Sequence, residues 1–270
     1  MPRRPDNPGR KGRAQKDTSL TAVRRRSPLT PFYVIIGVVV LAGVGVLLYQ
    51  MRGGAAPALE PVPVVMDQAA LARVPGIPIG PESAPVVIYE FADFQCPGCA
   101  QYATFVMPLV KQRLVDEGTV RYVYYDFPLV SIHQHAFLAS RAGRCANEQG
   151  RFWEYHDILY GRQPRWSAAR DATPLFVDYA ADAGLDRRAF ESCLRSDRYA
   201  EEVSQNMRLG ESLGVTGTPS IFVNGRRLQQ IPAYSDLERI VREEAGTSPA
   251  AGALPGAQPD MTSPEPPSGE

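Results

Sequence analysis

The chain has 270 residues, of which 44 % are hydrophobic, and it carries 29 basic and 29 acidic side chains. This length allows one large domain or two small ones, and the apolar content is sufficient for a buried core. Because the charges balance, net charge favours no class of partner. The basic residues before residue 30 are accounted for by a membrane-topology signal, without a nucleic-acid partner.

The N-terminal region predicts a membrane anchor. Residues 1–30 mix Arg, Pro, Gly and Ser with few apolar side chains, which predicts a disordered tail. Residues 31–50 contain the uncharged run FYVIIGVVVLAGVGVLLY, and a helix of this length spans roughly 27 Å, just enough to cross the hydrocarbon core. Short basic flanks stay in the cytoplasm, so we expect a single-pass anchor with the catalytic domain outside the cell membrane. A cleaved signal peptide or a buried soluble helix are the alternatives.

The rest of the chain divides by composition. Residues 51–65 are rich in Pro and Ala and predict a linker, and the Pro-rich residues 247–270 predict a second disordered tail. Residues 66–246 have the size of one folded domain.

That domain begins with a strand–helix–strand pattern. Residues 85–91 (PVVIYEF) and 120–127 (VRYVYYDF) are β-branched and aromatic, and predict two strands. Residues 96–117 between them predict one helix that ends at Gly118. A short helical connection of this kind makes the two strands parallel.

The second half of the domain predicts a helical insertion followed by a hairpin. Residues from about 132 to 213 read as helices, after which residues 220–223 predict a strand. Asn224-Gly225 then predicts a hairpin turn, and the capping-box pattern from Ser235 begins a terminal helix. The expected fold class is therefore α/β, with a helical insertion between a βαβ half and a ββα half.

The motif Cys96-Pro97-Gly98-Cys99 lies directly after a strand, where a helix begins. The thiolate is the reactive form of cysteine, and a helix N-terminus stabilises it. Cys96 would then attack, and Cys99, one turn deeper, would resolve the mixed disulfide. A static disulfide and half of a zinc site are the alternatives, although structural zinc takes four ligands and no second pair has metal spacing. We predict a redox pair that needs no cofactor or metal.

A second motif, Gly217-Thr218-Pro219-Ser220, precedes the third predicted strand. Proline at a strand start cannot donate to the ladder and requires a sheet edge or a special turn. If the Thr218–Pro219 bond is cis, the Thr218 backbone would face the disulfide and pair with an extended substrate. A trans bond is the default from sequence alone.

Together, these motifs resemble the DsbA-like, thioredoxin-fold disulfide oxidoreductases of bacterial envelopes. The resemblance covers about residues 70–245 and implies a thioredoxin-like fold with a helical insertion and a cis bond at Thr218–Pro219. It also implies that Glu90 is a buried acid that helps to move the proton of the buried cysteine; an exposed position at a strand edge is the alternative. Many family members carry His where this chain has Gly98, which leaves the oxidising strength open. The resemblance is carried by Glu90-Phe91, Phe94-Gln95-Cys96-Pro97-Gly98-Cys99, Tyr125-Asp126-Phe127-Pro128, Gly150-Arg151-Phe152-Trp153-Glu154-Tyr155-His156, Phe190-Glu191-Ser192-Cys193-Leu194 and residues 214–225.

Cys145 and Cys193 lie on predicted helices of the insertion and, outside the cytoplasm, should form a structural disulfide. Two separate buried thiols or a second redox pair are the alternatives. His133, His135 and His156 are interpreted as helix-end or packing residues.

These observations predict a monomeric, membrane-anchored enzyme that accepts electrons from the thiols of exported proteins. The resemblance implies a membrane reoxidant of the DsbB or vitamin K epoxide reductase type. The alternatives are a reductase or isomerase fed by a membrane electron donor, and a non-catalytic, membrane-tethered holdase.

Overall fold

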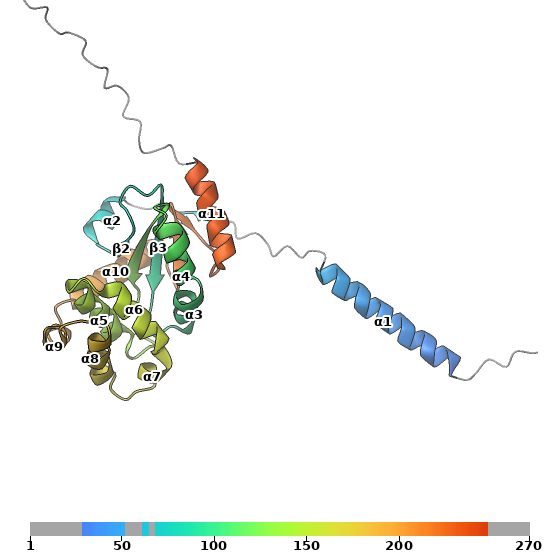
Figure 1. Cartoon of the computed structure of the whole chain (residues 1–270), viewed down its shortest axis with the longest axis horizontal. Helices are drawn as coiled ribbons and strands as arrows, with labels where there is room; N and C mark the ends of the chain where they lie inside the picture. The colour runs from blue at the N-terminus through green and yellow to red at the C-terminus, as the bar shows by residue number, and fades with distance from the viewer. Residues whose placement is uncertain (1–28, 52–60, 65–67, 248–270) are drawn as a thin grey trace, which may run out of the picture. The chain divides into compact units, whose positions relative to one another are not determined.

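The computed structural model describes residues 29–51, 61–64 and 68–247 (Figure 1). The chain has two units, Met1–Pro57 and Ala58–Glu270. Most of the predicted tails, residues 1–30 and 247–270, and most of the predicted linker, residues 51–65, lie outside the described residues.

The first unit contains helix α1 (Thr30–Met51), which includes the uncharged run of the predicted anchor. Within the part of the chain that the structure describes, no helix combines the length and the apolar character needed to cross a membrane. The anchor therefore stays a prediction.

The second unit is built on a mixed sheet. Its described strands lie in the order β1-β6-β5-β3-β4-β2. Central strands β3 and β4 are parallel, with Val86 opposite Val120 and Ala92 opposite Asp126, and the other neighbours are antiparallel. The strands are β1 (Val62–Pro63), β2 (Ile77–Ile79), β3 (Val86–Ala92), β4 (Val120–Asp126), β5 (Ser220–Val223) and β6 (Arg226–Arg227).

The connection between β3 and β4 is helical but not one continuous helix, so that prediction was wrong. It consists of α3 (Pro97–Phe105), α4 (Met107–Val110) and a π-helical segment (Lys111–Val115). Pro108 lies in the first turn of α4 and has no N–H to donate to the preceding turn, which explains the break.

Six described helices form the insertion between β4 and β5, which confirms the helical content expected of this α/β fold. They are grouped away from α11 in Figure 1. The helices are α5 (Ala136–Glu148), α6 (Phe152–Gly161), α7 (Gln163–Ser167), α8 (Thr173–Asp182), α9 (Arg187–Arg195) and α10 (Ala200–Ser212).

Among the described residues, helices α2 (Gln68–Arg73) and α11 (Tyr234–Thr247) also lie outside the insertion. Helix α11 begins one residue before Ser235, because the Leu237 N–H already bonds to the Ala233 carbonyl, 3.1 Å away. The hairpin turn consists of Asn224 and Gly225 with φ angles of 46° and 81°, the left-handed conformation that a tight turn between strands requires.

Apolar side chains pack on both faces of the sheet. Ile88 and Tyr122 face α3, α4 and α11 on one side, whereas Phe91 and Val123 pack against α2 and α10 on the other. The core of the insertion is continuous with the cysteine motif, since Cys99 belongs to the same apolar cluster as residues of α5, α6, α8 and α9.

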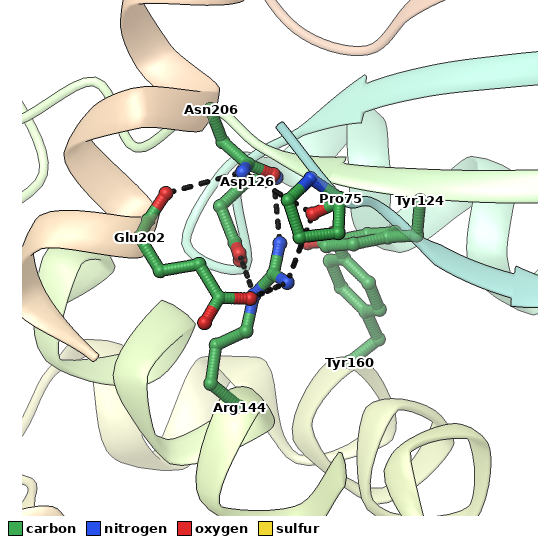
Figure 2. A network of polar contacts seen from close by, with 7 residues as sticks. All are labelled: Pro75, Tyr124, Asp126, Arg144, Tyr160, Glu202 and Asn206. Carbon is green, nitrogen blue, oxygen red and sulfur yellow. Dashed lines mark hydrogen bonds and ion pairs between the residues drawn. The ribbon is translucent and has the colours of Figure 1, made fainter. Parts of the chain in front are cut away.

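A buried arginine fastens the insertion to the sheet (Figure 2). Arg144 of α5 is 2 % exposed, and its Nε donates to Asp126 Oδ2 at the end of β4, 2.6 Å away. Its other nitrogens donate to Glu202 Oε1 at 2.5 Å and Asn206 Oδ1 at 2.7 Å, both on α10, and to the Pro75 carbonyl at 3.3 Å. A charge buried this deeply needs such partners, so the network holds α5, α10 and β4 in one arrangement.

Candidate active site

The cysteine motif forms the first turn of α3. Cys96 is the N-cap residue in an extended conformation, Pro97 follows at the start of the helix, and Cys99 lies one turn inside. Proline fits the first turn because the N–H that it lacks would be unpaired there. Both cysteines are free thiols; Cys96 is 9 % exposed and Cys99 is fully buried. Cys96 is therefore the sulfur that a second protein can reach.

The loop before β5 faces this turn. The Thr218–Pro219 bond is cis, and Cys96 Sγ lies 3.3 Å from the Thr218 carbonyl oxygen, within hydrogen-bond reach when the thiol is protonated. A Cβ placed on Gly98 would lie 3.5 Å from Pro219 Cδ, 3.7 Å from Cys96 Sγ and 3.3 Å from Ile231 Cδ1. The structure therefore brings Cys96, Gly98, Thr218 and Pro219 together at one surface site, with Ile231 at its edge.

The two thiols differ in acidity. A hydrogen bond from Cys99 is the main cause that lowers the pKa of Cys96 to about 5. Burial opposes this effect, whereas hydrogen bonds from Thr218 and from the backbone of the first helical turn add to it. Burial raises the pKa of Cys99 well above its ordinary value, and the negative charges of Cys96 and Glu90 raise it further. Cys96 is thus the thiolate and Cys99 the protonated thiol at neutral pH.

Glu90 lies on the central strand β3 and is 2 % exposed, not at an open strand edge. The Tyr122 hydroxyl donates to Glu90 Oε2, 2.7 Å away. Burial raises the pKa of Glu90 to about 7, and the Tyr122 hydrogen bond opposes that rise. A carboxyl with this pKa exchanges protons near neutral pH.

Sequence reasoning missed the residues that support the turn. Asp93 is fully buried, and its Oδ2 lies 2.6 Å from His133 Nδ1. Gln163 Nε2 of α7 donates to the carbonyls of Phe94 at 2.7 Å and Cys96 at 2.9 Å. Asp93 precedes Cys96 by three residues, but nothing local in the sequence pairs it with His133.

The other two cysteines are bonded to each other. Cys145 of α5 and Cys193 of α9 form a disulfide with a Cα–Cα distance of 5.9 Å, and both are at most 3 % exposed. Both cysteines pack in the core of the insertion, so the disulfide links α5 to α9 inside the protein.

His156 lies in the core among Phe94, Phe152 and Tyr160. His135 is also buried, and its Nε2 lies 2.8 Å from the Ala169 carbonyl. In the described ranges, no group of three or more His, Cys, Asp or Glu side chains is arranged to hold a metal ion.

The structure thus has a thioredoxin-like sheet with two cysteines of unequal acidity at the start of a helix, an arrangement suited to thiol–disulfide exchange. A family model described as thioredoxin matches residues 73–243, and the chain belongs to this family.

Individual relatives are of two kinds. The Na(+)/H(+) antiporter NhaA 3 of Salinispora tropica is 40 % identical over 148 residues, and the match spans 55 % of this chain but 21 % of the antiporter's length. The probable disulfide bond formation protein D of Bacillus anthracis is 26 % identical over 168 residues, which cover 62 % of this chain and 76 % of the relative.

Solved structures show the same fold. Oxidised BdbD from Bacillus subtilis matches with a TM-score of 0.60 and 21 % identity, covering 69 % of this chain and 99 % of that one. The reduced disulfide bond oxidoreductase DsbG from Mycobacterium tuberculosis matches with a TM-score of 0.54 and 23 % identity, covering 67 % and 95 % of the two chains.

Proposed function

We propose that this protein is an extracytoplasmic oxidase that introduces disulfides into exported proteins through Cys96 and Cys99. The observation that carries the proposal is the placement of two free thiols in the first turn of α3, with Cys96 at the helix N-cap 3.3 Å from the Thr218 carbonyl and Cys99 buried one turn deeper. In keeping with this placement, a hydrogen bond from Cys99 lowers the pKa of Cys96 to about 5 against the effect of burial. A stabilised thiolate favours the reduced form of the pair, so the oxidised form readily gives up its disulfide. This property supports the oxidase direction even though Gly98 supplies no positive charge.

The reaction has two exchange steps. A client thiolate attacks Cys96 Sγ, the Cys96–Cys99 bond breaks, and the electron pair leaves on Cys99, which takes up a proton. A second client thiolate then attacks the client sulfur of the mixed disulfide and releases Cys96 as a thiolate. The client gains one disulfide, and the cysteine pair gains two electrons.

Glu90 supplies the proton that Cys99 takes up and accepts it again during reoxidation. Glu90 is only 2 % exposed, and this burial raises its pKa to about 7. A carboxyl with such a pKa can give and take a proton near neutral pH, which supports this role. Thr218, whose carbonyl lies 3.3 Å from Cys96 Sγ, and Pro219 complete the surface against which the client chain lies.

The enzyme acts outside the cytoplasmic membrane as a monomer, held by residues 31–50 with the N-terminus in the cytoplasm. The basic residues before this segment support the orientation. The Cys145–Cys193 disulfide supports the compartment, because such bonds persist outside the cytoplasm. A membrane protein of the DsbB or vitamin K epoxide reductase type reoxidises the pair.

The reduction potential of the Cys96–Cys99 pair, measured by equilibration with glutathione, tests the direction. A value near or above about −180 mV supports the oxidase, because reductants such as thioredoxin lie near about −270 mV. A value near or below about −250 mV instead indicates a reductase fed by a membrane donor.

Variants of the two cysteines test the chemistry itself. The Cys99→Ser variant should accumulate a mixed disulfide with a client, whereas full function of Cys96→Ser would indicate a non-catalytic holdase.

A further inference from the structure

The backbone of Asp93 contacts both redox cysteines. Its carbonyl accepts from the Cys96 N–H at 3.1 Å. Its backbone amide is hydrogen-bonded to the side chain of Cys99, an interaction that opposes the effect of burial on that thiol. The placement of this one residue therefore affects both the nucleophilic sulfur and the leaving sulfur.

The strand does not fix that placement. Strand β3 ends at Ala92, whose carbonyl accepts the Phe127 N–H at 2.7 Å. From Asp93 to Cys96, the backbone has no strand neighbour to hold it. Side chains from outside β3 must determine its geometry instead.

Gln163 of α7 holds the carbonyls of Phe94 and Cys96, and the Asp93 carboxylate anchors the start of the segment. Oδ1 accepts the Gln95 N–H at 2.7 Å, and Oδ2 accepts the Leu129 N–H at 2.8 Å. His133 Nδ1 lies 2.6 Å from Oδ2. Because a carboxylate only accepts, Nδ1 must carry the hydrogen. Two of the three donors thus come from the loop after β4, 36 and 40 residues further along the chain.

The loop after β4 also contacts the segment before Cys96 through a second residue, Gln95. The His135 N–H donates to Gln95 Oε1 at 2.8 Å. His133 is the accessible member of the arrangement, since its side chain is 17 % exposed while that of Asp93 is fully buried. A substitution at His133 therefore alters one donor without opening the core.

We propose that His133 is a positioning residue of the exchange reaction, which acts through Asp93 to hold the Asp93 backbone in place between Cys96 and Cys99. Without the His133 donor, the buried carboxylate loses a short hydrogen bond and the Asp93 amide shifts from Cys99. The attack of a thiol on Cys96 then slows, because the departing Cys99 thiolate is less well stabilised. The inference rests on the proposed exchange chemistry, but not on its direction.

The test is the second-order rate constant for reduction of the oxidised protein by dithiothreitol. His133→Ala should lower it about tenfold, the effect of losing one hydrogen bond to a charged group. An asparagine places its amide nitrogen where Nδ1 stands, whereas a glutamine places it where Nε2 stands. His133→Asn should therefore restore most of the rate, and His133→Gln should not.

Leu237→Ala is the matched control. Leu237 is fully buried in α11 among residues that face the sheet, so this variant loses stability but should keep the wild-type rate. A loss of rate in Leu237→Ala equal to that in His133→Ala would overturn the proposal, because general destabilisation would then explain both.

Equal rates for His133→Asn and His133→Gln would also overturn it, and this comparison holds even if His133→Ala does not fold. A failure of the proposed function has a different signature. Wild-type protein that does not react with dithiothreitol contradicts the exchange chemistry, and a low reduction potential with a His133-dependent rate contradicts only the oxidase direction.

Discussion

The hydroxyl of Tyr122 donates a 2.7 Å hydrogen bond to Glu90 Oε2, and both side chains are buried on neighbouring strands. A buried carboxyl without a charged partner keeps its proton to higher pH. This pair therefore links the protonation of the site to the stability of the fold.

Stability should fall as the pH rises through the window that Glu90 defines. Burial raises the pKa of Glu90 from about 4.5 to about 7. Between these values the folded state holds a proton that the unfolded state has lost, so folding is favoured below the window and weakened above it. Glu90→Gln removes this dependence and should gain roughly 3 kcal/mol relative to wild type between pH 4.5 and pH 8.

Urea denaturation at several pH values measures the effect, in a background with Cys96→Ser and Cys99→Ser that keeps the other disulfide. Tyr122→Phe serves as the companion variant. It should extend the window to higher pH, because the hydrogen bond from Tyr122 lowers the pKa of Glu90. A difference between wild type and Glu90→Gln that stays constant with pH would contradict this account.

The Cys96 thiolate should titrate near pH 5 in the reduced protein. The hydrogen bond from Cys99 is the largest cause of that low pKa, with burial opposing it. Cys99→Ala should raise the midpoint by about one pH unit or more, since one unit corresponds to about 1.4 kcal/mol, comparable to one such hydrogen bond. Cys99→Ser keeps a hydroxyl donor and should lie closer to wild type.

Thiolate absorbance at 240 nm gives the midpoint directly, with Cys96→Ser as the blank. A wild-type midpoint near the ordinary value of a free thiol would be incompatible with the geometry described here.

Loss of Arg144 should be among the most destabilising single changes in the insertion. Arg144→Met leaves Asp126, which is fully buried, without its partner 2.6 Å away. Removing one member of a buried ion pair costs about 3–5 kcal/mol. Arg187→Met, which removes an exposed pair with Asp178, should cost less than about 1 kcal/mol. Chemical denaturation of the two variants checks the contrast, and similar losses would argue against the role of the buried network.

The sequence predicts the centre of this fold better than its edges. Strands β3 and β4 are long runs of β-branched and aromatic residues, and the α/β class follows from them. Strands β1 and β2 are too short to give a pattern: residues Val62–Pro63 pair with β6, and Ile77–Ile79 pair with β4, only because the rest of the sheet is present.

The candidate site was likewise only partly predictable from the sequence. Cys96 and Cys99 are recognisable because both lie in one motif, whereas the contacts that support them join distant residues. Asp93 and His133 are 40 residues apart, and Arg144 and Glu202 are 58 apart. Such pairs are selected by the packed tertiary structure and have no local signal in the sequence.

The shared core has a consequence for engineering. Cys99 packs in the same apolar cluster as Phe152 and Tyr155 of the insertion, and Gln163 of α7 binds the backbone of the cysteine turn. Trimming the insertion to obtain a minimal thioredoxin would therefore uncover the resolving cysteine and release the turn before it. Residues of the insertion cover the buried side of the redox centre, so a redesign of one must include the other.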